Sequence, residues 1–174
     1  MTLEDPDVLD RRMDFEISDA EFDKSILDQI DESYDVVLLD WNLEIPDARG
    51  VLDIVRQRTP DTRILALMSD VPSEDPIDRG ADEFLVQPVS DETLYRTIER
   101  LALEKEYEES MNELFRLATE RALLQTERDS DADVTDQYVS VTQELQECRD
   151  RAASIREELS LEEFDRALRQ LLDE

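Results

Sequence analysis

The sequence predicts an α/β domain built on a parallel sheet, followed by an all-α helical module. In the first hundred residues, short apolar runs rich in Val, Ile and Leu alternate with stretches of helical spacing. This alternation is typical of parallel strands that are buried on both faces and joined by helices. Beyond Leu101 the apolar residues keep a helical spacing and no strand pattern returns. We therefore expect two domains, residues 1–102 and residues 103–174.

The first domain is expected to alternate strands and helices in chain order. The apolar runs that predict strands are residues 34–40, 63–69 and 83–86, and a short strand is also expected over 14–17. The helices are expected after Ser18, over about 51–57, over about 74–79, and from Asp91 with Ser90 as its N-cap. A turn is expected at Thr59-Pro60-Asp61, between the helix and the second run.

The second domain is expected to be a helical hairpin or a coiled coil. Its first helix is interrupted at Asp129–Asp133, where short polar residues favour a turn. The next helix has apolar residues at alternating spacings of three and four, the seam of a coiled coil: Tyr138, Val141, Leu145, Cys148, Ala152, Ile155 and Leu159. This seam could pair with the 105–127 helix or with another chain. Ser160 and Glu163 match a capping box that opens a last helix containing Phe164.

Composition restricts the partners and the environment. The formal net charge is −29, from 48 acidic and 19 basic residues, so we expect no direct binding of nucleic acid. The basic residues are nearly all Arg, and only Lys24 and Lys105 are lysines. This balance resembles the proteins of salt-accumulating haloarchaea, in which molar salt screens the self-repulsion of the surface.

Several classes of site are excluded by residue counts. The chain has no His and a single cysteine, Cys148, so His-based metal sites, Ser-His-Asp triads and an intrachain disulfide cannot form. No signal-peptide pattern or long apolar run is present, and we expect a cytoplasmic protein without membrane segments. No second acidic residue is tied to Asp40 by a recognisable spacing, so the sequence does not predict an enzyme.

Three strand-end positions carry a family resemblance. Asp40 ends the first apolar run, Ser69 the second, and Pro88 follows the third, in the region where open α/β sheets bind ligands. With the order of elements, these residues resemble the receiver domains of response regulators, a flavodoxin-like fold, over roughly residues 1–102. The resemblance implies that Asp40 is the phospho-acceptor, a carboxylate nucleophile assisted by Mg²⁺.

The resemblance also assigns switch and metal residues. Ser69 matches the hydroxyl, and Phe84 the aromatic ring, that respond to the phosphoryl group; the alternatives are a strand-end cap and a core Phe. Gln87-Pro88 matches a Lys-Pro bond that is cis in typical receivers. The metal ligands that the resemblance implies are Glu4, Asp5, Asp40 and Asn42.

Three departures from the receiver pattern alter the expected site. The strand before Glu4 would be only three residues long, which predicts a sheet shortened at the N-terminus. Gln87 stands where the family has a Lys, and the loss of that cation removes a charge-assisted hydrogen bond of about 1.5–3 kcal/mol. Pro46 and Gly50 also lie two residues later than usual after Asp40.

The helical region resembles the HalX domain found behind receivers in haloarchaea. The resemblance is carried by Phe115-Arg-Leu-Ala and Arg121-Ala-Leu-Leu and by the following helices to Phe164. It implies a two-component response regulator with a sensor histidine kinase upstream, an unknown protein downstream and a homodimer as an option. The alternative is a pseudo-receiver that acts without phosphorylation as an interaction scaffold or dimerisation module.

Overall fold

The computed structural model describes residues 30–31, 33–42, 48–70, 75–129, 134–160 and 164. The chain divides into two compact units, Met1–Ala102 and Leu103–Glu174. The strands expected before residue 4 and over 14–17, and the helix expected after Ser18, lie outside the described residues.

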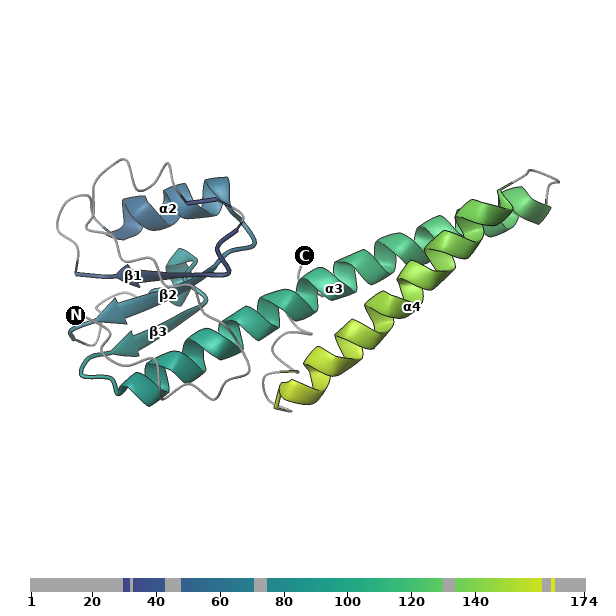
Figure 1. The fold of residues 1–174 in the computed structure, drawn as a ribbon. Coiled ribbons are helices and arrows are strands. Elements are labelled where there is room, and N and C mark those ends of the chain that lie inside the picture. Colours follow the sequence, from purple (N-terminus) through teal and green to yellow (C-terminus); the bar gives the residue numbers. More distant parts are fainter. Residues whose placement is uncertain are drawn as a thin grey trace. The chain divides into compact units, whose positions relative to one another are not determined.

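The first unit contains a parallel sheet of three strands in the described part of the chain (Figure 1). Its elements are β1 (Val36–Asp40), α2 (Ala48–Arg58), β2 (Arg63–Met68), the 3-10 helix η2 (Ile77–Arg79) and β3 (Glu83–Val86). The strand order β1-β2-β3 and the parallel pairing confirm the α/β prediction. Of the expected helix over 74–79, the described residues form one short 3-10 turn, Ile77–Arg79, which ends at the expected residue because Gly80 adopts a left-handed conformation with φ 101°.

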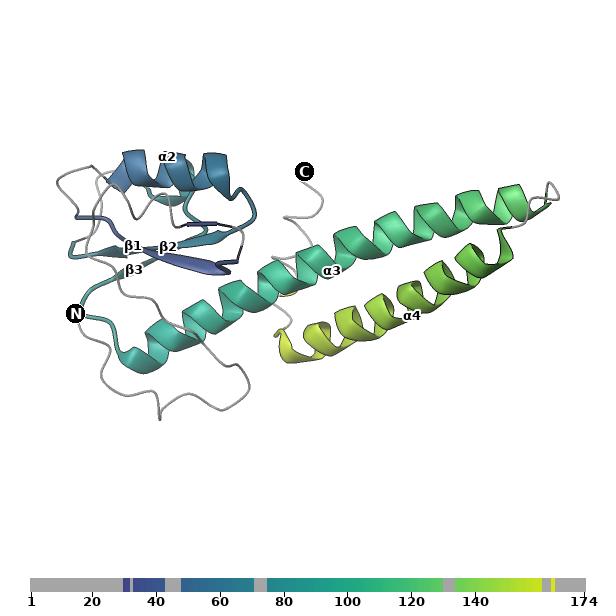
Figure 2. The same cartoon turned by 45° about the horizontal axis from the view of Figure 1, so that its top comes forward.

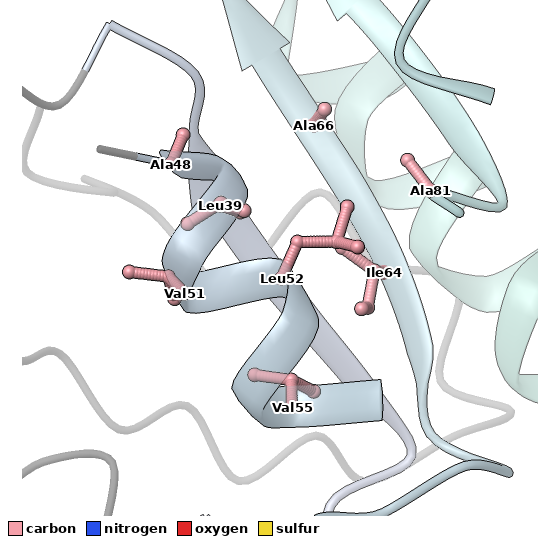
Figure 3. Close-up of a cluster of buried hydrophobic side chains, with 8 residues drawn as sticks. All are labelled: Leu39, Ala48, Val51, Leu52, Val55, Ile64, Ala66 and Ala81. Carbon is pink, nitrogen blue, oxygen red and sulfur yellow. The ribbon is translucent and has the colours of Figure 1, made fainter. Parts of the chain in front are cut away.

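The central strand β2 is buried on both faces of the sheet. On one face, Ile64 and Ala66 pack in a cluster with α2 and its neighbours (Figure 3). On the other face, Leu65 and Leu67 pack against Leu94 and Leu101. Because successive side chains of a strand point to opposite faces, a continuous apolar run is needed to fill both layers. This explains why consecutive residues of β2 are apolar and do not alternate with polar ones.

A buried ion-pair network holds the amino ends of β2 and β3. The Asp82 carboxylate accepts hydrogen bonds from the Ile64 backbone N–H (2.7 Å) and the Arg63 guanidinium (3.1 Å), and it also pairs with Arg56. Arg56 donates two further hydrogen bonds to the Gly80 carbonyl, at 2.9 and 2.8 Å. The side chains of Asp82 and Arg63 are only 8% and 9% exposed. The network therefore ties α2, β2 and the segment before β3 together.

The helix α3 (Asp91–Asp129) begins in the first unit and continues without interruption into the second. The expected N-cap is confirmed, because the Thr93 backbone N–H donates to Ser90 Oγ at 3.2 Å. Asp91 and Glu92 in the first turn add favourable charge at the helix N-terminus. The sequence indicated a change of period after Leu101, whereas the structure has one continuous helix there.

In the second unit, α3 and α4 (Thr135–Glu158) lie side by side as an antiparallel hairpin (Figures 1 and 2). The expected seam is buried from Val141 to Leu159, and its residues Val141, Leu145 and Cys148 pack against Leu117 and Leu124 of α3. Cys148 also donates from Sγ to the Ser110 carbonyl oxygen at 3.1 Å. The sequence allowed this seam to pair with the 105–127 helix or with another chain, and in the structure it pairs with α3 of the same chain.

Candidate functional site

Asp40 is the last residue of β1 and its side chain is exposed. The preceding residue, Leu39, is buried in the core, so the strand places Asp40 at the carboxyl edge of the sheet. The Trp41 backbone N–H donates to the Leu67 carbonyl at 2.7 Å, which extends the pairing with β2 beyond the end of the strand. The chain therefore presents a carboxylate to solvent from a rigid strand end, where ligands of parallel sheets bind.

Asn42 joins Asp40 to the end of the neighbouring strand. Its backbone N–H and its side-chain Nδ2 both donate to Asp40 Oδ1, at 2.9 and 3.2 Å. The same Nδ2 donates to Ser69 Oγ at 3.0 Å. The structure thus brings together three of the residues expected at the site, Asp40, Asn42 and Ser69. They form an exposed cluster of one carboxylate, one amide and one hydroxyl.

Gln87 and Pro88 lie just past the carboxyl end of β3. The Gln87 backbone N–H donates to the Met68 carbonyl at 2.7 Å, which holds the chain beside the end of β2. The peptide bond between Gln87 and Pro88 is cis, as the resemblance implies. The ends of all three strands therefore lie at one edge of the sheet, with Asp40, Ser69 and Gln87 following one another in strand order.

Phe84 lies on β3, paired with Ala66 of β2. Its ring is partly buried and packs against the cluster shared by α2 and the sheet. This position fits a core side chain, and it also leaves the ring on a strand whose end borders the Asp40 cluster. A role in responding to a phosphoryl group stays a prediction.

The donors for a metal ion are divided between described and undescribed parts of the chain. Asp40 offers an exposed carboxylate and Asn42 offers amide and backbone oxygens, which are ligand types that Mg²⁺ accepts. Glu4 and Asp5, the expected acidic pair, lie outside the described residues. Within the described part of the chain, no three His, Cys, Asp or Glu side chains are grouped to hold a metal ion.

The contact that sequence reasoning missed is the bridge made by Asn42. The resemblance implied only that Asn42 is a metal ligand, whereas its side chain connects Asp40 with Ser69. The signal in the sequence is a polar amide two residues after a strand-end carboxylate. Such side chains commonly bond to backbone and side chains close to them in the chain.

Comparison with known proteins identifies the second unit. Residues 104–171 match the family model of the HalX domain. A proposed transcriptional regulator of Haloferax volcanii is 30% identical over 110 residues, which cover 63% of this chain and 19% of that protein. The chain thus spans about a fifth of the length of this relative.

A solved structure is similar to part of the chain. It is the receiver domain of a sensor histidine kinase from Pseudomonas aeruginosa, with a magnesium ion in its active-site cleft. The similarity has a TM-score of 0.37 and 23% sequence identity, and it covers 40% of this chain and 61% of that one.

The fold and the HalX match describe two different parts of the chain. The chain combines an α/β unit, with a parallel sheet of three strands in its described residues, and a region over residues 104–171 that matches the HalX domain. The HalX match and the Haloferax relative also agree with the haloarchaeal character of the composition. No helix in the described residues is long and apolar enough to cross a membrane.

Proposed function

We propose that this chain is a two-component response regulator in which Asp40 accepts a phosphoryl group from a sensor histidine kinase. The HalX hairpin would relay the change to a downstream protein, because the net charge of −29 opposes approach to nucleic acid phosphates. The observation that carries the proposal is the exposed Asp40 carboxylate at the end of β1, joined through Asn42 to the Ser69 hydroxyl.

The chemistry follows from the donors around Asp40. A carboxylate oxygen attacks the phosphorus atom of the phosphohistidine, and the P–N bond breaks as the new P–O bond forms. The imidazole leaves with its electron pair and takes up a proton from solvent, while Asp40 becomes an acyl phosphate. The Asn42 amide and the Ser69 hydroxyl lie where they can donate hydrogen bonds to the new phosphoryl oxygens.

Bound Mg²⁺ would neutralise charge on the phosphoryl oxygens, as metal ions do in phosphoryl transfer. We propose Asp40 and Asn42, together with Glu4 and Asp5, as the residues that hold it. Gln87 can donate a hydrogen bond but carries no charge, so we expect a shorter-lived or more weakly formed phosphorylated state than a Lys at this position would give.

The test is a thermal melt in molar KCl with Mg²⁺ and beryllofluoride, which mimics a phosphorylated carboxylate. A ligand that binds only the folded state raises its stability, by about 2.7 kcal/mol at a ligand concentration of 100 times Kd. We expect a rise in melting temperature for the wild type and none for Asp40→Asn. Asp61→Asn is the matched control, since Asp61 is an exposed carboxylate in the same unit, and it should respond as the wild type does.

A second function is favoured by the uncharged Gln87 and by the Asn42 amide that already engages Asp40 Oδ1. In this alternative the α/β unit is a pseudo-receiver that acts as an interaction scaffold without phosphorylation. The same melt separates the two functions. No beryllofluoride response in the wild type, with Mg²⁺ present, would contradict phosphorylation at Asp40 and favour the scaffold.

A further inference from the structure

A second stripe of regularly spaced side chains runs along α3, on the face away from α4. Its spacings of three and four residues match those of a coiled-coil seam. The stripe consists of Asn112, Phe115, Thr119, Ala122 and Thr126, and Leu123 lies beside it. All of these residues are exposed, including Phe115 at 60% and Leu123 at 62%. The hairpin seam on the same helix, with Leu117 and Leu124, is buried.

The stripe carries no acidic side chain, although the chain as a whole has a net charge of −29. Residues 110–126 contain two acidic and two basic residues, which cancel. Both acids, Glu113 and Glu120, lie to one side and pair with Arg116, at 2.6 and 3.0 Å. The stripe is therefore a neutral surface on a strongly acidic protein.

The two hydroxyl groups of the stripe are already bonded within the helix. The Thr119 hydroxyl donates to the Phe115 carbonyl at 2.9 Å, and the Thr126 hydroxyl donates to the Ala122 carbonyl at 3.1 Å. These hydroxyls would keep their hydrogen bonds if a partner covered this face. Ala122 and the two threonines are also small, so a second helix can approach closely.

We propose that this stripe is the docking surface for a second copy of this chain. The α4 seam is not free for this role, because it is buried against α3 within the hairpin. A basic partner would be drawn to the acidic surface elsewhere, and not to a face without carboxylates. A stripe with coiled-coil spacing is complementary to an identical stripe, and two acidic copies repel each other least where they are neutral.

The stripe spans residues 112–126, which is about 21 Å of helix at a rise of about 1.5 Å per residue. A contact of this length is short, so we expect a dimer that forms with increasing protein concentration. It should also strengthen with KCl, because salt screens the repulsion between two copies of net charge −29.

Sedimentation velocity of the unphosphorylated protein across a concentration series in molar KCl tests the proposal independently of Asp40. We expect a monomer–dimer equilibrium for the wild type and a monomer for Ala122→Glu, which places a carboxylate in the stripe. Ala153→Glu is the matched control: Ala153 is an exposed alanine of α4 outside the stripe, and the dimer should persist. Circular dichroism checks that both variants keep their helices.

A wild-type chain that stays monomeric over the whole concentration and salt range would overturn the proposal. A folded Ala122→Glu variant that dimerises as well as the wild type would overturn it too, because the copies would then meet at another face. Equal loss of the dimer in Ala122→Glu and Ala153→Glu would also contradict it, since added charge alone would explain the effect.

Discussion

The two ends of the same parallel sheet hold two polar clusters of opposite character. At the amino ends of the strands, the Asp82 carboxylate is buried and bonded to Arg56, Arg63 and the Ile64 backbone. At the carboxyl ends, the Asp40 carboxylate is exposed and accepts hydrogen bonds from the backbone and side-chain N–H groups of Asn42. Both are aspartates beside a strand, yet only one environment leaves the carboxylate accessible to a ligand.

The difference separates a carboxylate that is committed to buried partners from one that solvent can reach. A buried carboxylate costs several kcal/mol of desolvation, which cations and N–H donors must offset, so Asp82 is committed to its partners. An exposed carboxylate keeps its water and costs little, so Asp40 is free to exchange water for a ligand. The fold thus commits the Asp82 end of the sheet to stability and leaves the Asp40 carboxylate accessible at the other end.

Asp82→Ala is expected to have the largest effect on the stability of the α/β unit. Removing one partner of a buried ion pair leaves the other charge uncompensated, and we expect a loss of about 3–5 kcal/mol in the free energy of unfolding. Urea titration in molar KCl measures it. Asp61→Ala, at an exposed turn residue of the same unit, should change the value by less than about 0.5 kcal/mol. A loss below about 1 kcal/mol at Asp82 would show that the network is not structural.

Gly80→Ala tests the amino end of the sheet by changing the backbone conformation that residue 80 can adopt. Gly80 has φ 101°, a conformation that costs an L-residue about 1–2 kcal/mol, and its carbonyl must stay in place to accept from Arg56. We expect a loss of that size by urea titration. Gly50→Ala lies within α2, where alanine is favoured, and stability there should be unchanged or raised by up to about 1 kcal/mol. Equal changes in the free energy of unfolding for Gly80→Ala and Gly50→Ala would contradict the role given to the left-handed conformation of Gly80.

Asp40→Asn should have the smallest effect on stability. Because Asp40 is exposed, we expect the free energy of unfolding without ligand to change by less than about 0.5 kcal/mol. The same variant should lose its whole response to beryllofluoride and Mg²⁺. A destabilisation as large as that of Asp82→Ala would mean that the two ends of the sheet are equally structural.

The sequence located the candidate site but not its internal contacts. The apolar run that ends at Asp40 and the polar residues after the next two runs placed three side chains at one edge of a parallel sheet. The bond from Asn42 to Ser69 joins residues 27 positions apart, and local patterns carry no information about such pairs. The Arg56–Asp82 pair could not be predicted for the same reason, since it joins residues 26 positions apart.

By itself, the sequence determined the parallel strands, the strand-end carboxylate, the Ser90 cap and the seam of α4, because each depends on residue types at short, regular spacing. The tertiary structure decided that the α4 seam packs within the chain against Leu117 and Leu124. It also decided that α3 continues through the boundary between the two units at Ala102. An apolar stripe specifies that it must be buried, but only the packing of the whole chain specifies which surface buries it.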